Sequence, residues 1–391
     1  MNPFLLRSLG VAAALAGTAA LAERPAGTPL ASCIAAEGQQ LDFSGVVSVV
    51  RPEGTTTWAH GLLTQAGSPA IDGGTRFNLG SAGKMFTAVA VAQLIDAGKV
   101  RLDDAIGLLV PGLTTEASAV TVRQLLTHSS GLGNFFSPEN LPAMEKARGV
   151  QDLLPLVAAE KPAFPPGSRF QYSNTGFLLL GLLIEHASGQ SYGEYLGVHV
   201  FGPAGMVASG LTPGPAATQA VGMTTMPAGG AASGRPRLGP GPGADRPRDP
   251  LRPAPEAALL GTPAGGGYST ATDLERFFAA LLQGRLTSAG MLKELSSSQI
   301  VAAPAKGEMP QLDHGLGFGV GTAHGHRWLG HNGGAPGVNV ETATYPDDRT
   351  TVIVLSNRDP PAASALFRKL RAVLFDPGAV KACGARTAVS Q

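Results

Sequence analysis

The sequence predicts an α/β fold of the α+β kind, in which an antiparallel sheet flanked by helices carries an inserted helical lobe. Short β-branched segments lie near both ends of the chain, helical patterns fill its middle, and a clear hairpin signal comes late. The chain has 391 residues, 43% of them hydrophobic, enough to bury a large core. We expect one domain over 23–391, with a sheet lobe from about 40–98 and 260–375 and a helical lobe from about 99–259.

The first sheet segment is rich in β-branched residues. Ser44–Arg51 predicts a strand, Pro52-Glu53-Gly54 a turn, and Thr55–Leu62 a second strand. A helix is expected over Lys84–Ala97, because apolar residues recur at helical spacing and Gly98 follows as a stop signal. The apolar residues expected near one face of that helix are Phe86, Val89, Leu94 and Ile95.

The middle of the chain shows helical patterns at Val122–Leu126, Val150–Ala159 and Gly176–His186, and no convincing strand between about 100 and 260. Gly210–Pro255 is dominated by Pro, Gly and Arg, and we expect no regular element there because Pro removes backbone donors. Two interpretations stay open for this segment. It is either a mobile surface loop or a flap over an active site, whose arginines attract carboxylates.

The last part of the chain returns to strands. Val338–Tyr345 alternates polar and apolar residues, Pro346-Asp347-Asp348 predicts a turn, and Thr350–Leu355 predicts the second strand of a hairpin. Ala362–Phe375 has the pattern of a closing amphipathic helix.

The N-terminal segment 1–22 has the features of a secretory signal peptide. Arg7 supplies the positive region, Leu9–Leu21 the apolar region, and Ala20-Leu21-Ala22 the cleavage pattern, with Glu23 as the first mature residue. The apolar run is shorter than the ~20 residues of a membrane span, so we expect no stable membrane anchor. The expected location is the periplasm or the medium. The net charge of +1 gives no indication of a nucleic-acid partner.

The two cysteines, Cys33 and Cys383, lie near opposite ends of the mature chain. After export they are able to form a disulfide that ties the termini together. The alternative is lipidation of Cys33, because Leu30-Ala31-Ser32-Cys33 resembles a lipoprotein cleavage box. Glu23, Arg24 and Pro25 separate that box from the apolar run, which favours the disulfide.

The first candidate motif is Ser81-Ala82-Gly83-Lys84. A serine hydroxyl is a weak nucleophile and needs a base within reach, and residues i and i+3 at a helix start share one face. Burial and the positive end of the helix dipole would lower the pKa of this lysine. The alternative is an ordinary helix start, but lysine is scarce here and small or apolar residues surround this one.

The second motif is Tyr172-Ser173-Asn174. Its tyrosine can pass protons between serine, lysine and a leaving group, and its asparagine can hold a substrate carbonyl. A buried tyrosine beside an N-cap asparagine is the alternative. The third motif, His331-Asn332-Gly333-Gly334, comes just before the hairpin, on or beside a strand edge. Its small residues permit close approach of a substrate, and free N–H groups there can bind an oxyanion, although a glycine turn has the same pattern.

Together the three motifs resemble the serine β-lactamase and penicillin-binding-protein superfamily, whose pattern is S-x-x-K, then Y-x-N, then K-T-G or H-x-G. The resemblance covers about residues 40–375 and points to the class C branch. That branch includes class C β-lactamases, D-alanyl-D-alanine carboxypeptidases, D-aminopeptidases and family VIII carboxylesterases. The flanking segments that add to it are Phe77–Gly80, Leu125–Leu132 and Gly265–Leu274.

The resemblance implies a β-lactamase/transpeptidase-like fold and a set of site residues. Ser81 would attack a carbonyl and form an acyl-enzyme, while Lys84 and Tyr172 share the proton transfers. Asn174 would contact the substrate. The backbone N–H groups of Ser81 and Gly334, beside Gly333, would form the oxyanion hole. No metal or organic cofactor is implied.

His331 occupies the position of the lysine in K-T-G, where it would touch Tyr172 or a substrate carboxylate. A histidine is mostly neutral near pH 7, whereas that lysine carries a charge that helps to hold a β-lactam carboxylate. We therefore expect an esterase-like or D-amino-acid peptidase-like hydrolase of small ester, amide or peptide substrates. A β-lactamase and a non-catalytic penicillin-binding sensor are the alternatives. A metal site built on His324, His326 and His331 is disfavoured because no acidic or cysteine ligand lies close by.

Overall fold

The computed structural model describes residues 29–226, 250–255, 261–305, 311–376, 378–380 and 383. The predicted signal peptide lies outside the described residues, as does much of the Pro/Gly-rich segment. Within the described residues, no helix combines the length and the apolar character that a membrane-spanning helix needs.

An eight-stranded antiparallel sheet forms the centre of the fold, in the order β2-β1-β12-β11-β10-β9-β8-β7. It joins strands from both ends of the chain. Its strands are β1 Gly45–Arg51, β2 Gly54–His60, β7 Ile300–Ala303, β8 Leu312–His314, β9 Gly319–Ala323, β10 His326–Ala335, β11 Val338–Tyr345 and β12 Thr350–Ser356. Two small antiparallel ladders pair β3 Phe77–Asn78 with β6 Tyr268–Ser269, and β4 Met223–Thr224 with β5 Arg252–Pro253.

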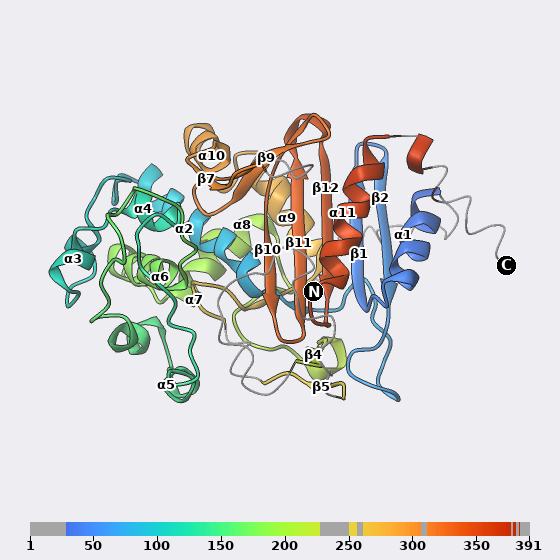
Figure 1. Ribbon diagram of the computed structural model, residues 1–391, viewed down its shortest axis with the longest axis horizontal. Helices are drawn as coiled ribbons and strands as arrows, with labels where there is room; N and C mark the ends of the chain where they lie inside the picture. Colours follow the sequence, from blue (N-terminus) through green and yellow to red (C-terminus); the bar gives the residue numbers. More distant parts are fainter. Residues whose placement is uncertain are drawn as a thin grey trace, which may run out of the picture.

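Helices surround this sheet, and α3 to α6 gather at one end of the molecule's long axis, on the left in Figure 1. The α-helices are α1 Pro29–Gln40, α2 Lys84–Asp96, α3 Thr115–Ser118, α4 Val122–Leu126, α5 Leu141–Lys146, α6 Asn174–Ser188, α7 Tyr192–Tyr195, α8 Gly202–Ala204, α9 Ala271–Leu282, α10 Ala289–Ser296 and α11 Ala362–Leu374. The 3-10 segments are η1 Gly80–Gly83, η2 Ile106–Leu108, η3 Val150–Leu156, η5 Ala216–Thr218 and η8 Pro346–Asp348, and η4 Leu196–Phe201 is a π-helix.

The two faces of the sheet bury different partners, because side chains alternate along each strand. Val46 and Ile353 face the core that contains α2, α6 and α9. Val47 and Val354 face the opposite core, which α1 and α11 cover (Figure 1). A disulfide between Cys33 in α1 and Cys383 ties the N-terminal helix to the C-terminal segment. The structure therefore contains the bridge that was favoured over lipidation of Cys33.

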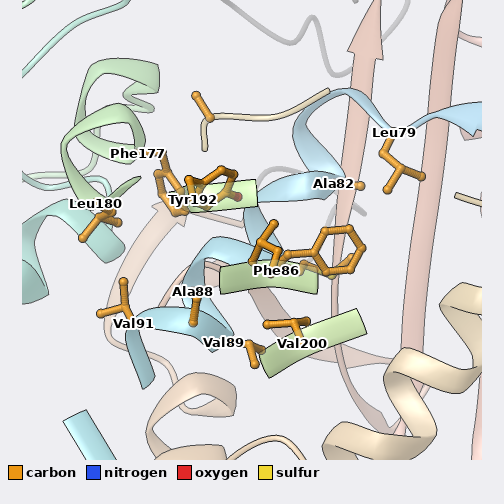
Figure 2. Packing of buried hydrophobic residues seen from close by; sticks show 14 of the residues in the cluster. Leu79, Ala82, Phe86, Ala88, Val89, Val91, Phe177, Leu180, Tyr192 and Val200 are labelled. Carbon is orange, nitrogen blue, oxygen red and sulfur yellow. The ribbon is translucent and has the colours of Figure 1, made fainter. Parts of the chain in front are cut away.

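Helix α2 is buried on more than the face that Phe86, Val89, Leu94 and Ile95 were expected to mark. Every residue from Lys84 to Ala92 is buried, because α2 lies between the sheet and the helical lobe. Figure 2 shows Phe86 and Val89 beside Val200 of η4, with Phe177 of α6 close by. The helix itself begins at the predicted residue and ends one residue early, at Asp96.

Three further expectations need correction. Strands do occur between 100 and 260, since Arg252–Pro253 of the Pro/Gly-rich segment pairs with Met223–Thr224; a proline is tolerated in such a short ladder with little lost pairing. The segment expected as a helix over Val150–Ala159 is a 3-10 helix over Val150–Leu156 that contains Pro155, a residue that an α-helix interior does not accommodate. Helix α1 precedes the expected start of the sheet lobe and packs on the face that α11 covers.

Candidate active site

Ser81 lies in a tight turn that leads into α2. Residues Gly80–Gly83 form a single 3-10 segment, and the Asn78 side chain accepts a hydrogen bond of 2.8 Å from the Gly80 N–H. In a 3-10 turn the side chains at i and i+3 eclipse each other. Lys84 therefore projects on the same side as Ser81, and its Nζ lies 3.3 Å from Ser81 Oγ. The structure brings together the pair that the first motif predicted.

The Lys84 amine is enclosed by neutral groups. Its Nζ donates to Asn174 Oδ1 at 2.7 Å and to the carbonyl of Ala264. It also lies 4.8 Å from the ring centre of Tyr172 and 5.4 Å from that of Phe177. No carboxylate in the described part of the chain pairs with this amine, and complete burial lowers its pKa well below the ordinary value. Burial therefore favours the uncharged amine, which is able to accept a proton.

The Tyr172 hydroxyl is buried at the same place. Burial raises the pKa of Tyr172, and the neighbouring Ser81 side chain opposes part of this shift. Among the described residues, no group meets the hydroxyl in full hydrogen-bonding geometry. The tyrosine therefore keeps its proton at rest, next to the serine and with its ring close to the lysine.

Asn174 belongs to the enclosure of the lysine. It is the first residue of α6, and its Nδ2 donates to Asn134 Oδ1 at 2.8 Å while its Oδ1 accepts from Lys84. The N-cap of α6 is Ser173, whose Oγ accepts from the Gly176 N–H at 2.9 Å, so the N-cap interpretation of Asn174 was wrong. Its contact with substrate stays a prediction, since both ends of the amide already have protein partners.

The end of β10 lies against the turn that carries Ser81. β10 lies inside the sheet, but its pairing with β9 ends at Gly330. From His331 onward the side of β10 that faces β9 has no strand partner among the described residues, so the third motif lies at a local edge of the sheet, as predicted. A Cβ at Gly333 would lie 2.0 Å from the carbonyl oxygen of Leu79, and one at Gly80 would lie 3.1 Å from the backbone nitrogen of Gly334. Only glycine permits the first approach. The backbones of Ser81 and Gly334 are thus close neighbours, as an oxyanion hole requires; the hole itself stays a prediction.

His331 is buried beside these groups. Its Nδ1 lies 2.5 Å from the carbonyl oxygen of Asn332, which can only accept, so Nδ1 carries the proton. Its ring centre is 6.3 Å from that of Tyr172. Burial, and then the nearby Lys84, lower the pKa of His331 to about 4. The imidazole is therefore uncharged at neutral pH.

Two more buried histidines lie here that sequence reasoning missed. His128 has its ring centre 4.2 Å from that of Tyr172, and His314 lies 4.9 Å from His128 and 6.3 Å from His331. Burial is the main cause that lowers the pKa of His314 to about 3 and that of His128 well below its usual range. His128 was visible within the segment Leu125–Leu132, whereas nothing in the sequence singled out His314.

The three histidines weighed for a metal site do not form one. His326 pairs with Asp348 at 2.8 Å, while His331 lies beside Tyr172. Among the described residues, no group of histidine, cysteine, aspartate or glutamate side chains is placed to hold a metal ion.

Comparisons with known proteins agree with this site. The family model described as Beta-lactamase matches residues 30–375. Penicillin-binding protein 4* of Bacillus subtilis is 27% identical over 353 residues, which are 86% of this chain and 74% of that protein. A D-aminopeptidase of Cereibacter sphaeroides is 25% identical over 85% of this chain and 59% of its own length.

A solved structure of a penicillin-binding protein from Bacillus halodurans has a TM-score of 0.72 and 26% identity, over 87% of this chain and 98% of that one. The family model matches most of the chain, and the matched residues include Ser81, Lys84 and Tyr172, which the fold brings together. The chain belongs to the β-lactamase family, within the superfamily of serine β-lactamases and penicillin-binding proteins.

Proposed function

We propose that this protein is an exported serine hydrolase that cleaves a carboxylic ester or amide through a Ser81 acyl-enzyme. The observation that carries the proposal is the buried Lys84 amine, 3.3 Å from Ser81 Oγ. A lysine whose pKa burial lowers is able to take the hydroxyl proton of an adjacent serine. Tyr172, close to both residues, provides a second group that can carry this proton.

Acylation follows from this arrangement. Ser81 Oγ attacks the substrate carbonyl carbon, and its proton passes to Lys84 directly or through Tyr172. The negative charge that develops on the carbonyl oxygen is stabilised by the adjacent N–H groups of Ser81 and Gly334. The tetrahedral intermediate then breaks the bond to the leaving alcohol or amine, which takes a proton from Tyr172.

Deacylation repeats these steps with water. Water gives a proton to the Lys84 and Tyr172 pair as its oxygen attacks the acyl carbon. The bond to Ser81 Oγ breaks, the carboxylic acid leaves, and the serine recovers its proton. Each turnover consumes one water and needs no cofactor.

The substrate class we propose is esterase-like or D-amino-acid peptidase-like. His331 stands where the superfamily's K-T-G motif has a lysine, and its pKa of about 4 makes it neutral at pH 7. A neutral group at this position attracts a substrate carboxylate less than an ammonium does, which disfavours efficient β-lactam hydrolysis. The related D-aminopeptidase supports a D-amino-acid substrate as one choice.

A substrate panel with a serine variant tests the function. The wild-type protein should hydrolyse p-nitrophenyl esters or D-Ala-D-Ala peptides faster than nitrocefin, and Ser81→Ala should abolish turnover. A fluorophosphonate should label the wild-type protein, and peptide mapping should place the label on Ser81. Full activity in Ser81→Ala, or a label on another residue, would refute the acyl-enzyme. Labelling by a fluorescent penicillin without turnover of any substrate would show the sensor instead.

Export is the second part of the proposal, and it rests on the features of residues 1–22. N-terminal sequencing of the protein recovered from a periplasmic or culture-medium fraction should begin at Glu23. Recovery of a protein that starts at Met1 from that fraction would argue against cleavage.

A further inference from the structure

His128 holds the chain on both sides of Tyr172. Its backbone carbonyl accepts a hydrogen bond from the Gln171 N–H at 2.8 Å. Its side-chain Nδ1 accepts another from the Ser173 N–H at 3.0 Å. One residue therefore fixes the backbone immediately before and immediately after the tyrosine.

The His128 ring also contacts the tyrosine ring directly. The two ring centres are 4.2 Å apart, with the planes tilted by 31°. Phe177 and His314 each lie 4.9 Å from the same imidazole. The imidazole is fully buried, and it limits the positions that the Tyr172 ring is able to take.

The hydrogen bond from Ser173 determines the tautomer of His128. Nδ1 can accept only as a bare nitrogen, so the proton of the neutral ring is on Nε2. Nε2 is buried and has no hydrogen-bond partner among the described residues. A histidine retained for core stability alone would be expected to satisfy both nitrogens, since an unmade buried hydrogen bond costs stability.

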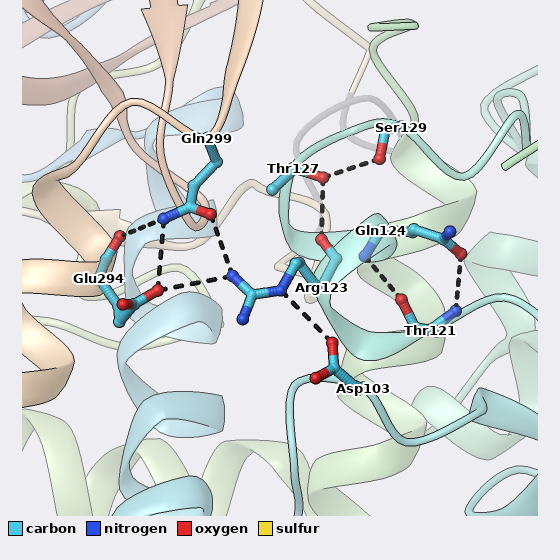
Figure 3. A network of polar contacts seen from close by, with 8 residues as sticks. All are labelled: Asp103, Thr121, Arg123, Gln124, Thr127, Ser129, Glu294 and Gln299. Atoms are coloured by element: carbon cyan, nitrogen blue, oxygen red, sulfur yellow. Dashed lines mark hydrogen bonds and ion pairs between the residues drawn. The ribbon is translucent and has the colours of Figure 1, made fainter. Parts of the chain in front are cut away.

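The backbone of His128 is held in an uncommon conformation. Its φ is 55°, in the left-handed region where residues other than glycine are rare and which is often found at functional sites. The preceding helix is anchored by Arg123, which bonds Glu294 at 3.5 Å and Gln299 at 3.0 Å (Figure 3). Thr127 donates to the Arg123 carbonyl at 2.9 Å, also drawn in Figure 3. The turn that presents His128 is thus tied to the start of the β7 region.

We propose that His128 is a positioning residue that holds the Tyr172 hydroxyl at Ser81 and Lys84. The hydrogen bonds from the Gln171 and Ser173 N–H groups fix the backbone position of Tyr172, and the contact between the two rings fixes the orientation of its side chain. This inference rests on the proposed function, in which Tyr172 carries protons during acylation and deacylation.

A pair of variants separates the side-chain acceptor from the backbone conformation. Both Gly and Asn tolerate a positive φ, but only Asn keeps an acceptor near the position of Nδ1. For p-nitrophenyl acetate we expect His128→Gly to lower kcat by about 100-fold, with KM changed by less than about threefold, because small misplacements of a reacting group have effects of that size. His128→Asn should recover about tenfold of that loss, as expected for one restored hydrogen bond.

All rates are expressed per active site, titrated with the fluorophosphonate, so that unfolded protein does not contribute. Leu153→Ala is the matched control: it removes apolar contacts from a buried position in the helical lobe, and should lower Tm without changing kcat per titrated site. Equal kcat in the Gly and Asn variants, or a change confined to KM, would overturn the inference.

A double-mutant cycle gives a second readout that does not require the Gly variant to fold. If His128 acts through the Tyr172 hydroxyl, His128→Asn should lower kcat in the wild-type background and have no further effect in Tyr172→Phe. If the double variant instead showed a kcat loss equal to the product of the two single-variant losses, the inference would be overturned. Failure of the proposed function has a different signature, since the wild-type protein itself would then carry no label on Ser81.

Discussion

Two ionisable side chains on opposite faces of the sheet are withdrawn from water, Lys84 completely and Glu341 in part, and their surroundings differ. Lys84 lies on the face toward the helical lobe, with neutral partners and no described carboxylate in contact. Glu341 of β11 lies on the face that α11 covers. There Ser364 donates to it at 2.6 Å, and Arg368 and Arg371 lie near enough to favour its charge.

Burial moves both groups toward their uncharged forms. It lowers the pKa of Lys84, and it raises the pKa of Glu341 to about 7 despite the arginines. Each group contacts a serine hydroxyl, but only Ser81, 3.3 Å from Lys84, also lies beside Tyr172 and the backbone of Gly333. The comparison shows that a perturbed pKa by itself does not identify a catalytic group. Whether desolvation serves chemistry depends on the other groups that surround the neighbouring hydroxyl, and among the described residues only Ser81 has a tyrosine and a glycine-lined backbone there.

The largest expected effect comes from Lys84→Met, which keeps an apolar side chain of similar length but removes the amine. We expect kcat/KM for a p-nitrophenyl ester to fall by about 10⁴-fold, because the serine loses its base. Steady-state kinetics measures this loss. Glu341→Gln is the control on the other face and should leave kcat/KM within about twofold of wild type, since Glu341 contacts Ser364 of α11 on the face opposite Ser81.

Equal losses of kcat/KM in these two variants would mean that Lys84 has no role in catalysis beyond that of Glu341. Circular dichroism on both proteins checks that each is folded before its kinetics is interpreted.

The disulfide is expected to affect stability and not chemistry, because it lies on the α11 side of the sheet. The double variant Cys33→Ser and Cys383→Ser should lose about 4 kcal/mol in the free energy of unfolding, as for a bridge that closes a long loop. Urea unfolding measures the loss. Turnover per titrated Ser81 should stay unchanged in native buffer, and a parallel loss of kcat would show that the bridge reaches the site.

The smallest expected effect is the pH dependence that Glu341 confers. The folded protein holds its pKa near 7, above the ordinary value of 4.5, so the protonated carboxyl is the form that folding favours. The associated stability is present below about pH 4.5 and is lost as pH rises through about 7. A pKa change from 4.5 to about 7 corresponds to a free energy on the order of 3 kcal/mol.

Glu341→Gln should remove this dependence. Urea unfolding at pH 5 and pH 8 should show a smaller loss between the two values in the variant than in wild type. If the variant lost as much unfolding free energy between pH 5 and pH 8 as wild type does, a group other than Glu341 would be responsible for the pH dependence.

Local patterns predicted much of the fold well. The hairpin of Val338–Tyr345 and Thr350–Ser356, helix Val122–Leu126, and the start of α2 at Lys84 were found because periodicity and turn residues agree there. Strands β7, β8 and β9 were missed. They are short, and β9 includes Gly319 and Gly321, so their strand conformation depends on pairing with neighbours and not on propensity.

The site shows the same division. The order of the three motifs in the sequence was enough to predict Ser81, Lys84 and Tyr172, and the structure brings these three together. His314 gave no signal, because its importance comes only from its distance to His128 and His331. His128 was part of a recognised segment, but its hydrogen bond to the Ser173 N–H joins residues 45 positions apart.

The sequence by itself determined which residue types are available for chemistry and the family to which their order belongs. The tertiary structure alone decided their protonation. The pKa of Lys84 is lowered because Asn174, 90 residues away, and Ala264, 180 residues away, replace water around its amine. Desolvation depends on every atom that surrounds a charge, and these atoms come together only when distant segments pack.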